Sequence, residues 1–417
     1  MALLGLHLDV AVNGPDFSGT EEGTKEELDM QTRDSFPDIL RGFALLGIAM
    51  VNVQYFAVDT VSGFESADLA GSANSAAAFI VMFFFQSKFY LLFSFLFGYS
   101  AHYVIKGERA NRSRWVGRSV GLILFGVVHF VFLFHGDILF LYGVFGLVLL
   151  SFYFRPDNTV RRWARGIYIF SAVFFTLLAL LVAVGEAFLA SKGKTLPDDT
   201  SGLGGLNQAL ASGGFLEAAA ARFELWLSFA PQGFLLQGPL VMVAFLVGVL
   251  VARKNGLASG ANPALMRRMA IWGIALGLPL QLAAAAIYIF NLLADQYSLG
   301  LSLISLALNF LTAPILSAGY VGVLWLISER LGGIALLSAG GRHSLTIYLS
   351  QSVIFSVLFS AWGLGLFAQL DAWLVALTAF LTWLVLSVLA MVNLRFFTRG
   401  PMETVLTNFS KLFVSKA

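Results

Sequence analysis

The sequence predicts an all-α fold: a polytopic integral membrane bundle of about ten helices. Of the 417 residues, 58% are hydrophobic and only 12% are charged, whereas charged residues make up roughly a quarter of a typical soluble domain. The mean hydropathy is +0.81. Apolar runs of about 20 residues, enough to cross a hydrocarbon core of ~30 Å, recur between charged breaks along most of the chain.

These apolar runs fill most of the chain and define its organisation. The expected spans cover residues 38–58, 77–104, 116–134, 137–154, 166–189, 231–251, 269–292, 301–328, 343–362 and 371–393. Residues 37–404 therefore form a single transmembrane domain, in which 190–223 is expected to be the largest extracytoplasmic loop. Residues 1–36 are acidic and lack a basic start, so we expect a polar, disordered cytoplasmic leader and no cleaved signal peptide. Residues 405–417 are expected to be a cytoplasmic tail.

Charge in the connecting segments predicts the orientation. Alternate loops at 106–118, 155–165 and 252–268, and the segment at 395–399, are rich in Arg and Lys, which the positive-inside rule places in the cytoplasm. The intervening connections carry acidic residues and face outward, namely Asp59, Glu65, Asp68, Asp137, Asp295 and Asp371. With ten spans, both termini lie in the cytoplasm.

Composition also excludes several classes of function. The chain has no cysteine, which rules out disulfides, thiolate metal ligands and a thiol nucleophile. A net charge of +2 gives no electrostatic footprint for nucleic acid. The sequence contains no Walker loop, no dinucleotide fingerprint and no metal-ligand motif such as HExxH, so we expect no metal site. Gly98, Gly143 and Gly146 are better explained as helix-packing notches than as phosphate cradles.

Polar residues at membrane depth are the candidates for function, because an ionisable group there costs roughly 2.5–3.5 kcal/mol. Asp38 and Arg41 lie three residues apart and can pair at the cytoplasmic start of the first span. That pair is either a helix-start anchor or part of a site. Asn52 lies deep in the same span and is either a helix–helix contact or a substrate contact.

Lys88 lies in the middle of the second expected span, about eleven residues from either end. It is too far from the surface to extend comfortably to water, so we expect it to face a cavity or a carboxylate. An anion site or a counter-ion is the favoured interpretation.

His129 and Asp137 bracket a tight turn between the third and fourth spans, with Gly136 just before the aspartate. The hairpin can bring the imidazole and the carboxylate together, which is the arrangement of a general base with its orienting acid. The alternative is an interfacial histidine with Asp137 capping the next helix.

Arg342 stands among small residues at the cytoplasmic entry of the ninth span, and Gln351 follows within that span. Arg342 can hold a phosphate or acyl-carrier group at a helix start, or can act as a charge anchor. The segment from Arg395 to Glu403 is interpreted as a cytoplasmic stop and turn.

Five motifs in the same order resemble the YeiB-like family of bacterial polytopic membrane proteins. They are LRGFALLGI followed by Asn52, KFYLLFSFLFG, His129 eight residues before the Asp of GDIL, GRHSLTIYLSQS, and LRFFTRGPME. The resemblance spans about residues 33 to 404. Ile347, Ser350 and Thr404 depart from the family pattern.

The resemblance implies a bacterial cytoplasmic (inner) membrane protein related to transmembrane acyltransferases, including the acyltransferase-3 and heparan-α-glucosaminide N-acetyltransferase groups. The resemblance implies a role in the site for the residues that match the family motifs, namely Asp38, Arg41, Asn52, Lys88, His129, Gly136, Asp137, Arg342 and Gln351. We therefore expect His129, held by Asp137, to deprotonate a small-molecule, glycan or lipid acceptor near the outer face. Arg41 and Arg342 would meet the phosphates of acyl-coenzyme A as co-substrate, with no bound cofactor, while Lys88 and Asn52 line the path between them.

The alternative is a transporter or exporter without covalent chemistry, in which Lys88 and Asp137 couple substrate to protons. Spans 1–5 and 6–10 show no obvious inverted repeat, which counts against it. A structural or regulatory role is the third interpretation, and a lysine in the middle of a span argues against that.

Overall fold

The computed structural model describes residues 35–69, 71–194, 204–257 and 261–414. Nearly all of the predicted leader lies outside these residues, as does the end of the tail. Contacts separate Met1–Ser35 from the unit that begins at Phe36, and the description that follows concerns that second unit.

The described residues confirm an all-helical protein, with no strand among them. Its helices are α2 (Phe36–Ala57), α3 (Ser72–Ile80), α4 (Lys88–Ile105), α5 (Arg112–Phe132), α6 (Leu139–Tyr153), α7 (Asp157–Ser191), α8 (Gly204–Ser212), α9 (Phe215–Leu236), α10 (Gly238–Ala252), α11 (Pro263–Leu292), α12 (Leu299–Leu331), α13 (Ala335–Arg342), α14 (Ser344–Phe359), α15 (Ala372–Asn393) and α16 (Pro401–Lys411). Short turns η1 (Gly63–Ser66), η2 (Val81–Phe85) and η3 (Arg109–Asn111) connect them.

Seven helical segments are long and apolar enough to cross a membrane, and α9 with α10 forms an eighth that bends by 49°. The two remaining expected spans correspond to the shorter apolar helices α6 and α14. Each predicted span therefore has a helical counterpart. The region expected as a loop at 190–223 is helical over most of its described part, because α7 extends to Ser191 and both α8 and the start of α9 fall within it.

Hydrogen bonds between the connecting segments follow the predicted alternation of charge. At the end that carries the acidic connections, Thr60 bonds to Asn207 and to His135, and Asn74 bonds to Asp371. We call this the acidic end. At the other end, the basic end, Arg253 pairs with Asp157, and Gly107 bonds to the hydroxyl of Tyr153. Loops of like predicted orientation are therefore joined to one another at the same end of the bundle.

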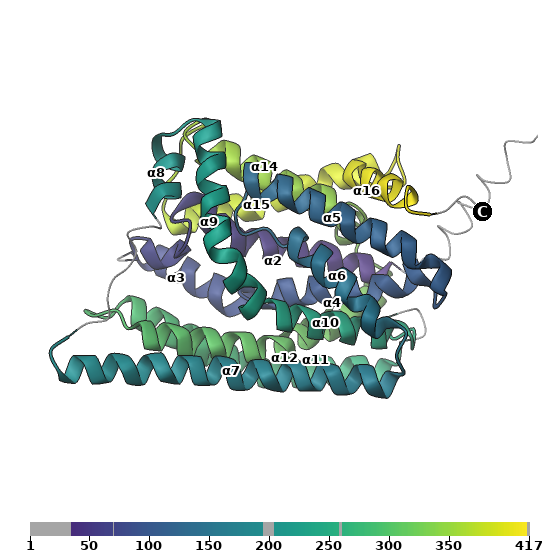
Figure 1. The fold of residues 1–417 in the computed structure, drawn as a ribbon, viewed down its shortest axis with the longest axis horizontal. Helices are drawn as coiled ribbons and strands as arrows, with labels where there is room; N and C mark the ends of the chain where they lie inside the picture. Colours follow the sequence, from purple (N-terminus) through teal and green to yellow (C-terminus); the bar gives the residue numbers. More distant parts are fainter. Residues whose placement is uncertain (1–34, 70, 195–203, 258–260, 415–417) are drawn as a thin grey trace, which may run out of the picture. The chain divides into compact units, whose positions relative to one another are not determined.

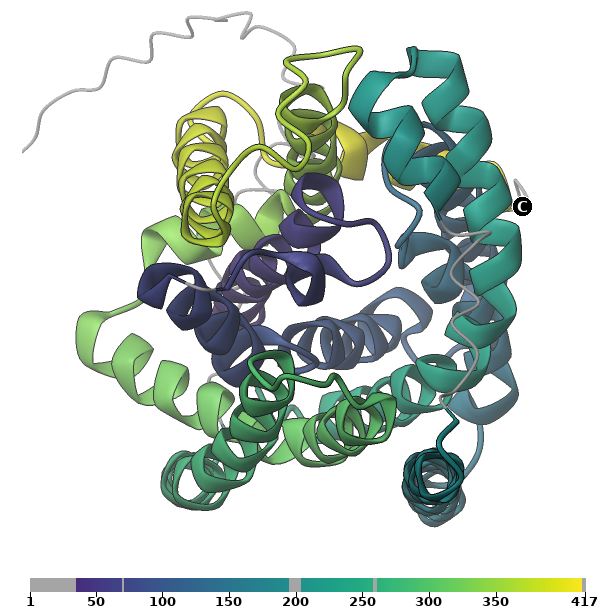
Figure 2. The same ribbon diagram turned by 90° about the vertical axis from the view of Figure 1, so that its left-hand side faces the viewer.

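Helix α2 lies inside the bundle, packed against α4, α13, α14 and α15. Figure 2 looks along the helices from the acidic end, and Figure 1 shows α7 along one side of the bundle, where it packs against α12. Helix α12 packs in turn against α11. Close packing depends on glycine, as predicted. An added Cβ at Gly98 on α4 would lie 2.2 Å from the carbonyl oxygen of Phe245 on α10, and one at Gly143 or Gly146 would crowd Ser119 on α5.

The second span is broken in the middle. The π-helical turn η2 ends at Phe85, where the amide of Gln86 bonds to the carbonyl of Val81, and Ser87 then takes a left-handed backbone with φ of 69°. A new helix, α4, begins at Lys88. No glycine or proline marks this break, so the sequence predicted one continuous helix there.

Candidate functional site

The central feature of the site is a buried chain of three side chains. Nδ1 of His129 lies 2.7 Å from Oδ1 of Asp137, and Nε2 lies 2.8 Å from Oγ of Ser352. Both the His129 and Asp137 side chains are fully shielded from solvent. Because a carboxylate only accepts, the proton of the neutral imidazole sits on Nδ1, and the Ser352 hydroxyl donates to Nε2.

Local structure explains how this chain of contacts forms. Helix α5 ends at Phe132, and the turn that follows returns the backbone so that Asp137 faces His129 on the last turns of α5. The second carboxylate oxygen of Asp137 accepts the amide of Phe140 at 2.7 Å and so caps the start of α6. The contacts that the two interpretations of Asp137 require are both present, because the same carboxylate bonds to the imidazole and to an amide of the first turn of α6. Proton transfer by His129 stays a prediction.

A cavity of about 400 Å³ adjoins this chain. Asp137 and Tyr348 form part of its wall, and the Tyr348 ring lies 5.0 Å from the His129 ring between centroids. Asn52 and Gly136 also line it, so two further predicted residues belong to this site. His129 and Ser352 stand behind the wall, 1% and 3% exposed.

The rest of the cavity wall is mainly aromatic and neutral polar. It includes Tyr55, Phe85, Gln86, Tyr90, Phe134, His135, Trp226, Phe229 and Gln232, and no lysine or arginine. His135 donates from Nε2 to the carbonyl of Thr60 at 2.7 Å. Burial lowers the pKa of His135 to about 4, despite that hydrogen bond, and Arg222 lowers it further. At neutral pH this second imidazole is therefore uncharged.

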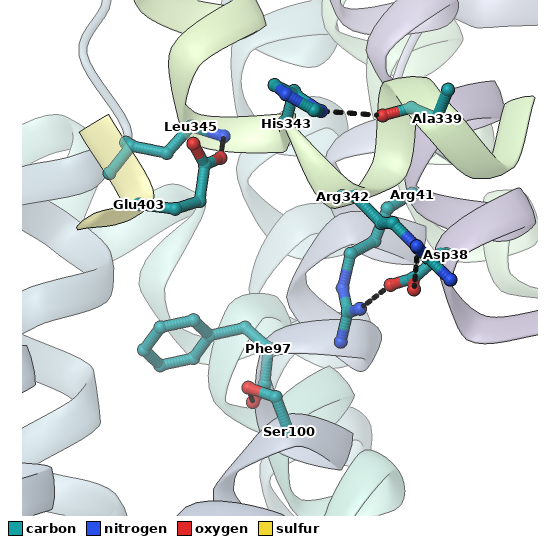
Figure 3. Close-up of polar contacts among 9 residues, drawn as sticks. All are labelled: Asp38, Arg41, Phe97, Ser100, Ala339, Arg342, His343, Leu345 and Glu403. Atoms are coloured by element: carbon teal, nitrogen blue, oxygen red, sulfur yellow. Dashed lines mark hydrogen bonds and ion pairs between the residues drawn. The ribbon is translucent and has the colours of Figure 1, made fainter. Parts of the chain in front are cut away.

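At the basic end, the predicted arginines converge on one carboxylate. Nη1 of Arg41 lies 2.5 Å from Oδ1 of Asp38, the pairing expected from their spacing, and Nε of Arg342 lies 3.9 Å from Oδ2 (Figure 3). Asp38 is 1% exposed, whereas Arg41 and Arg342 remain partly accessible. Arg342 ends α13, and His343 separates it from the start of α14, so it does not lie inside that helix.

A third arginine, Arg118 on α5, belongs to the same region. Its guanidinium lies 6.0 Å from the centre of the Phe97 ring, its Nε is buried without a hydrogen-bond partner, and Arg41 is among its charged neighbours. Figure 3 shows Arg41 extending toward Phe97 and Ser100. Arg118 therefore neighbours Arg41, which pairs with Asp38, and Glu403 is a further charged neighbour of Arg118.

The structure corrects the expected surroundings of Lys88. Its side chain is completely buried, and Nζ donates to the backbone carbonyl of Met82 at 2.9 Å across the break in the second span. No carboxylate lies within 4.0 Å of it among the described residues, and it lines neither cavity discussed here. The left-handed turn at Ser87 directs Lys88 back toward η2, which satisfies the ammonium group locally.

Gln351 also has a local structural partner, because Nε2 donates to the carbonyl of Leu45 at 3.4 Å and ties α14 to α2. Sequence reasoning missed Tyr348, Ser352 and Arg118. Ser352 and Tyr348 stood inside a recognised motif, but their link to His129 joins positions more than 200 residues apart and has no signal in a single sequence. Among the described residues, no cluster of three or more His, Asp or Glu side chains could hold a metal.

The fold and the site define the class of this protein. It is a polytopic helical membrane protein with a buried pair of ionisable side chains, His129 and Asp137, inside the bundle. Within that class, the chain is similar to the YeiB-like family that its sequence motifs resemble. Residues 251–411 match the family model described as "Protein of unknown function (DUF418)". No solved structure matches the chain.

Two relatives are similar over most of their length. "Uncharacterized protein YxaH" of Bacillus subtilis (strain 168) is 28% identical, covering 88% of this chain and 91% of that protein. "Uncharacterized protein YeiB" of Escherichia coli (strain K12) is 26% identical, covering 88% and 93%. A "39.9 kDa protein in amylase 3'region" of Bacillus acidopullulyticus is 36% identical over 28% of this chain and 33% of its own length.

Proposed function

We propose that this protein is an acyltransferase of the bacterial cytoplasmic membrane. It takes an acyl group from a cytoplasmic acyl-coenzyme A at the basic end and transfers it to a small-molecule, glycan or lipid acceptor at the acidic end. The observation that carries the proposal is the buried contact of 2.7 Å between His129 and Asp137 beside an aromatic and polar cavity. An imidazole oriented by a carboxylate is the arrangement of a general base.

The chemistry assigned to His129 is proton transfer. Nε2 accepts the proton of the acceptor hydroxyl or amine, whose oxygen or nitrogen then forms a bond to the acyl carbon. The carbon–sulfur bond of the thioester breaks, the sulfur takes the proton from the His129 imidazolium, and coenzyme A leaves as the thiol. Asp137 keeps the ring proton on Nδ1 and stabilises the imidazolium. Because Ser352 occupies Nε2 in the structure, the acceptor takes the place of that hydroxyl after Tyr348 moves from the cavity wall.

The donor site rests on Arg41 and Arg342 beside Asp38 and on Arg118, which neighbours Arg41. Guanidinium groups bind phosphates in bidentate fashion, and Arg118 has a buried Nε without a hydrogen-bond partner. Helices α2 and α14 link the two sites. Arg41 lies near the start of α2 and Asn52 of the same helix lies on the cavity. Only His343 separates Arg342 from the start of α14, and Tyr348 of α14 lies on the cavity. We infer that the acyl-bearing arm of the donor extends along these two helices to the acceptor cavity.

Purified full-length protein in nanodiscs tests the proposal, with labelled acetyl-coenzyme A as donor and a panel of sugars and amino alcohols as acceptors. We expect transfer of label by the wild type. A loss of about 10²–10⁴-fold is expected in His129→Ala, the range that a positioned base contributes. His102→Ala is the matched control, because His102 contacts Tyr153 near the basic end and lies outside both proposed sites.

The donor site has a separate readout. We expect Arg118→Gln and Arg342→Gln to raise KM for acyl-coenzyme A with little change in kcat, because they contact phosphates that do not react. Absence of transfer under all these conditions, with uptake of a solute into proteoliposomes, would replace the proposal with the transporter alternative.

A further inference from the structure

A second, smaller cavity of about 190 Å³ lies at the acidic end, between η1, α2, α3, α11 and α12. Tyr55 and Gln86 belong to its wall and to that of the larger cavity, so the two are neighbours. Its volume is below the roughly 300 Å³ of pockets for drug-sized ligands. The cavity therefore suits a small molecule, and the charge and chemistry of the residues that line it determine which class of molecule can bind.

One carboxylate dominates this wall. Glu65 accepts hydrogen bonds from the hydroxyls of Tyr297 and Ser302 at 3.2 and 3.3 Å, both long for O–H donors. Among the described residues that line the cavity there is no lysine, arginine or histidine. Within 4.0 Å of the Glu65 carboxylate, the described part of the chain places no cationic nitrogen.

The electrostatic surroundings of Glu65 favour a positive ligand. Burial raises the pKa of Glu65, the two hydroxyls oppose that effect, and Asp59 adds to it. Two neighbouring carboxylates therefore share a region with no cation on its wall. An ammonium group in the cavity would neutralise this charge and restore the lost solvation of Glu65.

The remaining wall has the chemistry that accompanies ammonium recognition. Tyr55, Phe64 and Tyr288 contribute aromatic rings, and Gln54, Gln86 and Ser302 contribute neutral polar groups. Aromatic faces attract alkylammonium groups through the ring quadrupole, and a carboxylate beside them supplies the counter-charge. An anion would meet Glu65 with no compensating cation, and a purely apolar ligand would bury that carboxylate without a partner.

We propose that this smaller cavity is a binding site for a small organic cation with an ammonium group, in which Glu65 is the counter-ion and Tyr55 and Tyr288 form aromatic walls. The site does not depend on acyl transfer. Cation binding and transferase activity are separate measurements on the same preparation, so either result stands without the other.

The test compares choline with its uncharged isostere 3,3-dimethylbutan-1-ol, using calorimetry on the detergent-solubilised full-length protein. We expect choline to bind at least tenfold more tightly than the alcohol. Ethanolamine and methylammonium extend the comparison to smaller cations.

Two matched substitutions assign the charge. Glu65→Gln preserves shape and hydrogen bonding, and we expect it to weaken choline binding at least tenfold while binding of the alcohol stays unchanged. Asp295→Asn removes one negative charge from an exposed loop residue at the same end, and we expect it to bind choline as the wild type does. The thermal unfolding midpoint and the elution volume establish that each variant is folded.

Three outcomes would overturn the site. The first is equal affinity for choline and the alcohol. The second is unchanged choline binding in a folded Glu65→Gln protein. The third is no binding of any of the three ammonium probes by the wild type.

Discussion

Glu403 and Thr346 join the starts of two helices that lie 57 positions apart in the chain. Oε2 of Glu403 accepts the Thr346 hydroxyl at 2.6 Å, and Oε1 accepts the amide of Thr346 at 3.3 Å. Oε1 also accepts the amide of Leu345 at 2.6 Å (Figure 3). The first amides of a helix have no partner within the helix. Glu403 of α16 therefore caps α14, the helix that carries Tyr348 and Ser352.

Removal of this cap should destabilise the bundle at its basic end. We expect Glu403→Ala to lower stability by about 1–2 kcal/mol, the usual range for loss of a helix cap, and Glu403→Gln to have a smaller effect. The thermal unfolding midpoint in detergent measures this. Glu329→Ala, at an exposed position near the end of α12, is the control. An equal midpoint for Glu403→Ala and the control would contradict the capping role.

Lys88 is expected to act chiefly as a structural residue. Its long side chain fills buried space, and its Nζ satisfies the Met82 carbonyl at the break in the second span. Lys88→Ala removes both contributions and should cost about 2–5 kcal/mol, as large-to-small core substitutions do. Lys88→Met keeps most of the volume and should cost less. The thermal unfolding midpoints of the two variants test this prediction. An equal loss of stability in Lys88→Ala and Lys88→Met would show that packing at this position is unimportant.

Glycine at position 98 should be essential for the contact between α4 and α10. An added Cβ would lie 2.2 Å from the backbone oxygen of Phe245, and backbone cannot move aside as a flexible side chain can. We expect Gly98→Ala to reduce the yield of folded, monodisperse protein sharply. Gly166→Ala, on α7 with nothing within 4 Å of its added Cβ, should leave the yield unchanged. A normal elution profile for Gly98→Ala would contradict the predicted clash.

His135 should make the protein less stable in mild acid. Its pKa falls from an ordinary value of 6.5 to about 4 in the folded protein, mainly because it is buried. Below pH 6.5 the unfolded chain therefore takes up a proton that the folded protein binds more weakly. The stability that neutral His135 provides is complete above pH 6.5 and is lost progressively as the pH falls toward about 4.

The unfolding midpoint measured from pH 7 to pH 4 tests this dependence. We expect His135→Gln, which can still donate to the Thr60 carbonyl, to show a flatter profile over that window. Asp59 and Arg222 are the charged neighbours of His135. The variant Asp59→Asn separates the contribution of the Asp59 charge to the pH dependence from that of His135 itself. Parallel profiles for the wild type and His135→Gln would show that another group controls the acid response.

Local spacing was sufficient for two contacts of the candidate site. Asp38 and Arg41 lie one helical turn apart, and the tight turn after α5 confines His129 and Asp137 to the same hairpin, so both pairs could be predicted from sequence. Ser352 and Arg118 could not be predicted, because their roles depend on how α14 and α5 pack against other helices. The surroundings of Lys88 were mispredicted because the break at Ser87 has no glycine or proline to signal it.

The sequence alone determined that this chain is a helical membrane protein, where its spans lie and which loops share an end of the bundle. Those properties follow from hydrophobic length and loop charge, which are local and additive along the chain. The tertiary structure alone decided that Ser352 meets His129, that Arg118 neighbours Arg41, and that Glu65 faces a cavity. Such contacts depend on helix rotation and close packing between distant segments, and a single sequence does not encode these in any local pattern.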